Sequence, residues 1–166
     1  MKQRILSILV DNTAGVLSRV SGLFSRRGYN IDSLTVGVTA DPRYSRMTVV
    51  CSGDDQVLEQ ITKQLNKLVD VRDIKMLEPD SSVSRELILV KVRVSKENRQ
   101  NVTAITDIFR ANVIDVGLDS MVIELTGSKS KLEAFLNLMG DGNEILEIAR
   151  TGITGLSRGS DYVLFL

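Results

Sequence analysis

Hydrophobic residues along this chain follow two spacings, one typical of strands and one typical of helices. An apolar run at residues 4–10 predicts a strand, and it leads into Asp11-Asn12-Thr13, whose side chains can cap a helix. The next apolar residues recur every three or four positions and predict one inward-facing helix surface: Val16, Leu17, Val20, Leu23 and Phe24. Gly28 predicts the end of this helix, because glycine readily adopts the left-handed C-cap conformation.

The remainder of the first half predicts a hairpin, a second helix and a closing strand. Alternating apolar residues at 34–38 and 47–51 flank the turn residues Asp41-Pro42. A helical stripe follows at 58–68, and residues 71–77 predict a final strand. The resulting order, βαββαβ, is typical of an antiparallel sheet with both helices on one face.

A similar order recurs after a polar segment that holds one of the two prolines. Strand and helix spacings alternate through the second half, beginning with a strand: residues 88–94, 102–109, 121–125, 132–139 and 145–148. We therefore predict an α+β fold with two ferredoxin-like domains at residues 1–78 and 86–166, joined by a linker at 79–85. The glycine-rich tail at 151–159 falls in the second domain.

Composition narrows the classes of function. Lys plus Arg and Asp plus Glu each number 21, so no long-range field draws the chain to nucleic acid or to an anionic membrane. Cys51 is the single cysteine, and the N-terminus lacks a secretory signal, which together predict a cytoplasmic location. No apolar stretch approaches the roughly 20 residues that span a bilayer.

The chain contains no histidine, and this affects every chemical hypothesis. Ser/His/Asp and Cys/His catalytic devices are impossible without it, and zinc sites lose their commonest ligand. We therefore predict no catalytic residues, no metal site and no cofactor of the chain's own.

The segment from Asp11 to Leu17 is the strongest candidate for a binding site. A strand that enters a helix through polar residues and Gly15 places unpaired backbone N–H groups and the positive end of the helix dipole at one point. A carboxylate suits that point. The alternative, which this segment alone favours, is an ordinary capped helix in which Gly15 only eases a turn.

Five segments resemble known proteins. Residues 10–20, VDNTAGVLSRV, resemble the N-terminal signature of ACT domains, which sense amino acids. Four more resemble the small subunit of acetolactate synthase and extend over the chain: GLFSRRGYNIDSLTV at 22–36, SRMT at 45–48, QITKQLNKLVDV at 60–71 and GITGLSRG at 152–159. The resemblance identifies the first domain as an ACT domain.

This resemblance implies a valine site at the interface of a homodimer. The implied ligands are Asn12, Ala14, Gly15, Val16 and Leu17 of one chain with Asn30 and Ile31 of the other. N–H groups near Gly15 would bind the carboxylate, and amide oxygens of Asn12 or Asn30 could accept from the ammonium group. Ile31, with Val16 or Leu17, could cover the isopropyl group. Without the resemblance, Asn30 would be a turn residue and Ile31 a core strand residue.

The resemblance also implies a regulatory role in the biosynthesis of valine, leucine and isoleucine. The chain would bind the large catalytic subunit, a transferase that uses thiamine diphosphate, Mg and FAD, raise its activity and relay feedback inhibition by valine. The sequence leaves open whether leucine or isoleucine also binds. It also leaves open whether the tail at 151–159 contacts the catalytic subunit or is a flexible terminus. Residues 96–102 contain no glycine at the corresponding helix start, so no ligand site is predicted in the second half.

Two other classes remain as alternatives. RNA-recognition domains share the βαββαβ order, but they need aromatic residues on the central strands and a basic surface, and the strand at 46–51 has no aromatic residue. A small enzyme of ferredoxin-like fold would need a nucleophile or base. It would have to rely on Asp11, Asp32, Tyr29 or Lys2, none of which has an evident partner in the sequence.

Overall fold

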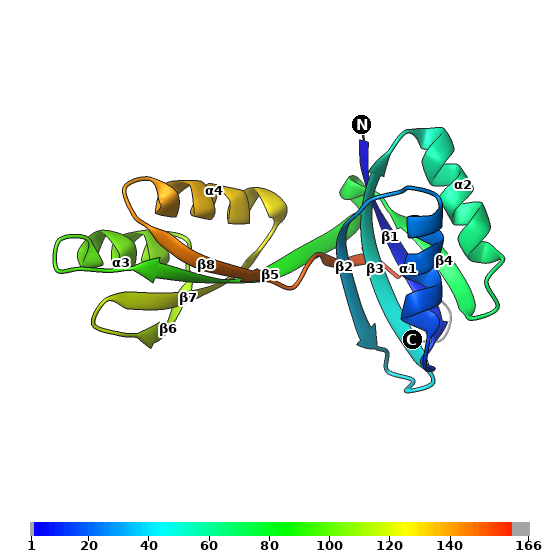
Figure 1. The fold of residues 1–166 in the computed structure, drawn as a ribbon, viewed down its shortest axis with the longest axis horizontal. Helices are drawn as coiled ribbons and strands as arrows, with labels where there is room; N and C mark the ends of the chain where they lie inside the picture. Colours follow the sequence, from blue (N-terminus) through cyan, green and yellow to red (C-terminus); the bar gives the residue numbers. More distant parts are fainter. Residues whose placement is uncertain (1, 161–166) are drawn as a thin grey trace. The chain divides into compact units, whose positions relative to one another are not determined.

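The computed structural model describes residues 2–160, which divide into two compact units (Figure 1). The first unit contains residues 2–84 together with 153–160, and the second contains Arg85–Gly152. Each unit has its own antiparallel sheet and its own hydrophobic core. This confirms the predicted α+β fold with two βαββαβ units.

The first unit contains a four-stranded sheet with the strand order β2-β3-β1-β4. Its elements in chain order are β1 (Lys2–Asp11), α1 (Val16–Arg26), β2 (Ile31–Val38), β3 (Tyr44–Gly53), α2 (Asp55–Asn66) and β4 (Val71–Leu77). Both helices cover the same face of this sheet (Figure 1). Strands β2 and β4 lie at its edges, with β1 and β3 at the centre.

The register of β1 and β3 decides which side chains form the core. Ile8 lies opposite Met47, and both are buried beneath the helices. Their neighbours along the strands, Ser7 and Thr48, also lie opposite each other and point to the other face, because successive side chains alternate. The first sheet therefore has one apolar face under α1 and α2 and a second face that carries buried polar groups.

The helix face predicted from spacing is confirmed except at one residue. Val16, Val20, Leu23 and Phe24 are buried, whereas Leu17 is 47% exposed. Each residue turns a helix by about 100°, so Leu17 cannot share the direction of both Val16 and Val20. At the other end, Gly28 has φ +69, as predicted for a C-cap glycine.

The second unit repeats the topology with the strand order β6-β7-β5-β8. Its elements are the part of β5 (Ser82–Arg93) from Arg85 onward, α3 (Arg99–Ile108), β6 (Asn112–Val116), β7 (Ser120–Gly127), α4 (Lys129–Gly140) and β8 (Ile145–Arg150). Phe109 and Phe135 pack edge to face in its core, with ring centroids 5.4 Å apart. The spacing analysis did not identify β6, an edge strand on which Ile114 and Val116 are exposed.

The predicted linker and C-terminal boundary differ from the structure. Residues 79–85 are not a loop, because η1 (Pro79–Ser81) is a 3₁₀ turn and β5 begins at Ser82. The tail holds a further strand, β9 (Thr154–Ser157), which pairs with β5 and belongs to the first unit. The sequence pattern instead predicts this tail in the second domain. Residues 161–166 of that assignment lie outside the described range.

Contacts distant in sequence hold β9 in the first unit. The backbone N–H of Ile153 donates to Ser33 Oγ at 2.8 Å, and Thr35 Oγ1 donates to the Ile153 carbonyl oxygen at 3.2 Å. Gly155 is buried, and a Cβ atom there would lie 3.0 Å from both Leu77 and the carbonyl oxygen of Val83. Only glycine permits this close approach without displacement of the neighbours.

Candidate functional site

The start of α1 is an exposed loop that ends at Gly15. Gly15 is the N-cap residue and adopts the left-handed conformation, with φ +85. No side chain caps α1, so the predicted cap from Asn12 or Thr13 is wrong. The amide nitrogen of Asn12 instead donates to the carbonyl oxygen of Pro42 at 3.0 Å. The first-turn N–H groups of α1 thus lack a side-chain acceptor and can serve an external anion.

An arginine that the sequence analysis did not select lies over Gly15. A Cβ atom at Gly15 would be 3.0 Å from Arg19 Nη1, so the guanidinium group sits directly against the glycine. Arg19 Nε pairs with Asp70 Oδ2 at 2.6 Å, and this ion pair holds the side chain in place. A carboxylate at the helix start would therefore meet a positive charge as well as N–H groups.

The sequence contains only part of the information needed to predict that Arg19 lies at Gly15. Arg19 follows Gly15 by four residues, which places it one turn along the same helix face. Asp70 is 51 positions away and reaches Arg19 because its backbone carbonyl oxygen accepts from the N–H of Asp11 at 2.9 Å. The pairing of β1 with β4 creates this contact.

A second ion pair fixes the end of β1 beside the loop. Arg72 donates to both carboxylate oxygens of Asp11, at 2.7 and 2.9 Å. The hydrogen bond to Asp11 and the charge of that carboxylate raise the pKa of Arg72. The two ion pairs, from Arg19 and Arg72, hold the loop against the start of β4.

Of the two aliphatic residues of this loop that were predicted to contact valine, one is buried and one is exposed. Val16 is buried in the core under α1, so its side chain cannot line an external site. Leu17 is exposed and follows at once, and Ala14 is exposed on the other side of Gly15. Of the two aliphatic residues predicted to cover an isopropyl group from this loop, only Leu17 is available.

Asn30 and Ile31 lie at the opposite end of α1. Asn30 is exposed and donates to Asp32 Oδ1 at 2.9 Å, and Ile31 is partly buried against the core. The 11 residues of α1 separate this end from Gly15, a distance of about 16 Å along the helix axis. The structure therefore does not bring the seven predicted site residues together within one chain.

The described residues 2–160 also bear on metal binding, membrane insertion and thiol chemistry. In this range no group of three or more His, Cys, Asp or Glu side chains is placed to hold a metal ion. None of the helices described is long and apolar enough to cross a bilayer. Burial, and to a lesser extent the charge of Asp32, raises the pKa of the Cys51 thiol to about 11, so this thiol is not ionised at neutral pH.

A βαββαβ unit with an open, glycine-containing helix start defines the first unit as an ACT domain. The sequence model of the family described as AHAS small subunit-like ACT domain matches residues 6–73. A second model, described as small subunit of acetolactate synthase, matches residues 85–159. The chain belongs to the family of acetolactate synthase small subunits, as the sequence resemblance predicted.

Several relatives and one solved structure are similar to this chain over nearly its whole length. The acetolactate synthase isozyme 3 small subunit of Escherichia coli K12 is 52% identical over 157 residues, which cover 95% of this chain and 96% of that protein. A probable acetolactate synthase small subunit from Methanothermobacter thermautotrophicus is 50% identical, with 94% and 93% covered. The crystal structure of the Thermotoga maritima small subunit superposes with a TM-score of 0.88 at 42% identity, covering 97% of this chain and all of that one.

Proposed function

We propose that this regulatory small subunit binds valine between the ACT domains of two copies of the chain. In this proposal it activates the large catalytic subunit of acetolactate synthase and transmits feedback inhibition by valine to it. The observation that carries the proposal is the open start of α1, where Arg19 lies over Gly15. The N–H groups and the guanidinium group would together bind the valine carboxylate.

The second half of the site would come from the other copy. Asn30 and Ile31 lie a helix length from Gly15, so they can meet the helix start only if two chains are present. Asn30 would accept from the ammonium group, and Ile31 with Leu17 would cover the isopropyl group.

Exposed apolar residues on an edge strand support a homodimer. Strand β2 is at the edge of the first sheet, and Val36 and Val38 are 48% and 62% exposed on it. Leu17 adds a further exposed aliphatic side chain on α1. Pairing of β2 with a second copy would cover these residues and the unpaired backbone groups of the edge.

Regulation would follow from a difference in affinity between two arrangements of the complex. Valine shifts an equilibrium only if it binds one arrangement more tightly, and such couplings are typically about 1–3 kcal/mol. The catalytic chemistry, with thiamine diphosphate, Mg and FAD, would belong wholly to the large subunit.

Sedimentation and calorimetry on the full chain test the proposal. We expect a dimer at micromolar concentration and a valine isotherm with one site per chain, because a symmetric dimer contains the arrangement twice. A ligand bound only by the folded dimer stabilises it by about 2.7 kcal/mol at one hundred times its dissociation constant, so valine should raise the melting temperature. Alanine should raise it less, because it cannot fill an aliphatic pocket. A monomer with and without valine, or equal responses to both amino acids, would contradict the interface site.

A further inference from the structure

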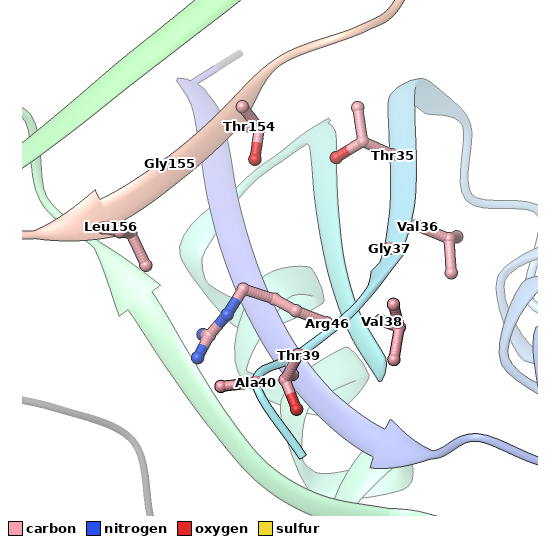
Figure 2. Close-up of a pocket in the computed structure, with 10 residues that line it drawn as sticks. All are labelled: Thr35, Val36, Gly37, Val38, Thr39, Ala40, Arg46, Thr154, Gly155 and Leu156. Atoms are coloured by element: carbon pink, nitrogen blue, oxygen red, sulfur yellow. The ribbon is translucent and has the colours of Figure 1, made fainter. Parts of the chain in front are cut away.

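The face of the first sheet opposite its helices contains a pocket of about 400 Å³ (Figure 2). Residues 35–40 of β2 and the following turn form one wall, and residues 154–156 of β9 form the other. Arg46 of β3 lies between them. The whole pocket belongs to the first unit, and none of its residues takes part in the proposed valine site.

Three segments that resemble the small-subunit family meet at this pocket, and none of their residues that line it is among the proposed valine ligands. They are residues 22–36, 45–48 and 152–159, which lie far apart in the sequence. The hydrogen bonds of Ile153 to Ser33 and Thr35 join the first of these segments to the third. Arg46 belongs to the second segment, residues 45–48. Its side chain extends across the sheet face toward Leu156 and Ala40, which also line the pocket (Figure 2).

Arg46 carries an incompletely satisfied charge. Its Nη1 donates to Ser7 Oγ at 2.7 Å, whereas Nη2 is buried and has no hydrogen-bond partner within the described part of the chain. Burial lowers the pKa of Arg46, and the charge of Asp73 only partly opposes this effect. Arg46 as a whole is only partly buried and lines the pocket, and among the described residues no carboxylate forms a salt bridge with it. An anion in the pocket would therefore gain a charge-assisted contact with the guanidinium group.

The other pocket residues indicate what kind of anion would fit. Thr154 contributes a hydroxyl group, whereas the hydroxyl groups of Thr35 and Thr39 already donate to the carbonyl oxygens of Ile153 and Asp41. Ala40 and Leu156 contribute apolar surface. Among the described lining residues none is acidic, so the pocket offers no carboxylate to an ammonium group. An amino acid is therefore a poorer fit than a carboxylic acid of similar size.

We propose that this pocket binds a small aliphatic monocarboxylate that has no ammonium group. The carboxylate pairs with Arg46, and the alkyl part lies against Leu156. Because β9 forms one wall, occupancy of the pocket stabilises β9 on the first sheet. This second site is separate from the amino-acid site at the start of α1 and does not depend on it.

Isovalerate, which is valine without its amino group, is the probe. Calorimetry measures the binding of isovalerate to the full chain. The amide NMR signals of residues 35–40 and 154–156 show whether it binds at the pocket. Isovaleramide, which has the same shape and no charge, is the control ligand. We expect isovalerate to shift these signals and isovaleramide to leave them unchanged at equal concentration.

Two kinds of variant test the proposed contacts. Arg46→Gln should weaken isovalerate binding about tenfold or more, because it removes a charge-assisted hydrogen bond. Leu156→Asp places a negative charge at the pocket wall without altering Arg46, and Leu156 is 58% exposed, so the fold should tolerate it. Leu156→Asp should weaken isovalerate about tenfold relative to the uncharged Leu156→Asn.

Several results would overturn the proposal. Equal binding of isovalerate and isovaleramide would exclude recognition of the charge. Unchanged isovalerate affinity in Arg46→Gln, or equal affinity in Leu156→Asp and Leu156→Asn, would exclude Arg46 as the anchor. Displacement of isovalerate by valine would place the ligand at the helix start instead of in this pocket.

Discussion

The two units start their first helix at corresponding places in the same topology, but in different ways. Before α1, Gly15 has a positive φ and an exposed backbone, and no side chain caps the helix. Before α3, Asn98 has φ −109, and its Oδ1 accepts from the N–H of Ser95 at 2.6 Å. The Asn98 amide nitrogen donates to the carbonyl oxygen of Arg93 and to Asn143, both at 3.0 Å.

This difference shows that a shared topology does not by itself create a ligand site. The βαββαβ order places a helix N-terminus at the end of the first strand in both units, with the same dipole. Neither helix start is capped by a side chain, but in the second unit the N–H of Arg99 donates to the Ser95 carbonyl oxygen, and the Asn98 side chain is bonded to Arg93 and Asn143 beside it. A ligand site at such a position requires local residues that leave the helix start open, and the fold alone does not provide it.

The largest expected effect comes from a charge placed at the open helix start. Gly15→Asp sets a carboxylate beside Arg19 where the valine carboxylate would bind. At about 4 Å and an effective dielectric near 20, the repulsion is about 4 kcal/mol, or about a thousandfold in affinity. Calorimetry with valine and inhibition assays on the reconstituted enzyme measure this loss.

Backbone strain is another possible cause of lost valine binding in Gly15→Asp. A matched variant in the second unit measures the effect of strain separately. Gly15→Asp should also cost about 1 kcal/mol of stability because of the positive φ. Gly142 has a similar φ, +81, and open space around it, so Gly142→Asp carries the same charge and strain away from the site. Loss of valine binding in both variants would refute a specific carboxylate site at Gly15.

The next effect concerns stability at the two helix starts. Asn98→Ala removes hydrogen bonds to Ser95, Arg93 and Asn143, and we expect the free energy of unfolding to fall by about 1–3 kcal/mol. Asn12→Ala removes one side-chain hydrogen bond from an exposed residue, so it should cost less than about 1 kcal/mol. Urea denaturation compares the two, and equal losses would show that the two helix starts are equally ordered.

A smaller effect is expected at Leu17. Leu17→Ala should weaken valine about tenfold, because it removes aliphatic surface from the proposed pocket. It should change the free energy of unfolding by less than about 0.5 kcal/mol, since Leu17 is exposed on α1. Ile108 is 71% exposed at the end of α3, and Ile108→Ala is the matched control. An unchanged valine affinity in Leu17→Ala would remove this residue from the site.

A further effect is a pH dependence that Cys51 gives to the first unit. The Cys51 thiol ionises near pH 9 when unfolded, but burial raises its pKa to about 11 in the folded chain. Between these values the unfolded chain loses a proton that the folded chain retains. The stability that the buried, protonated Cys51 thiol contributes is therefore fully present below pH 9 and is lost as the pH rises toward 11.

Cys51→Val removes the thiol and so isolates its contribution to the pH dependence of stability. Denaturation of the two proteins at pH 8 and pH 10.5 should show a steeper alkaline loss in the parent chain. The second unit has no cysteine, so any transition assigned to it should respond equally in both proteins. Identical pH profiles for the first unit would contradict the raised pKa.

The sequence alone determined the alternation of strands and helices, since these periodicities reflect which side of each element is buried. It placed the core residues of α1, although Leu17 was wrongly included, the glycine C-cap at Gly28 and the βαββαβ order of the first unit. It also located Gly15 at a helix start, because a strand-like run changes to a helical spacing at that point. These are local properties, each visible within about a dozen residues.

The tertiary structure decided the features that depend on residues distant in the chain. Asp70 reaches Arg19 only because β4 pairs with β1, and this contact aims a cation at Gly15. Strand β9 joins the first unit because Gly155 permits close approach and Ile153 bonds to Ser33 and Thr35, more than a hundred positions earlier. Hydrophobic spacing carries no information about such partners, because it records which side of an element is buried and not what lies against it.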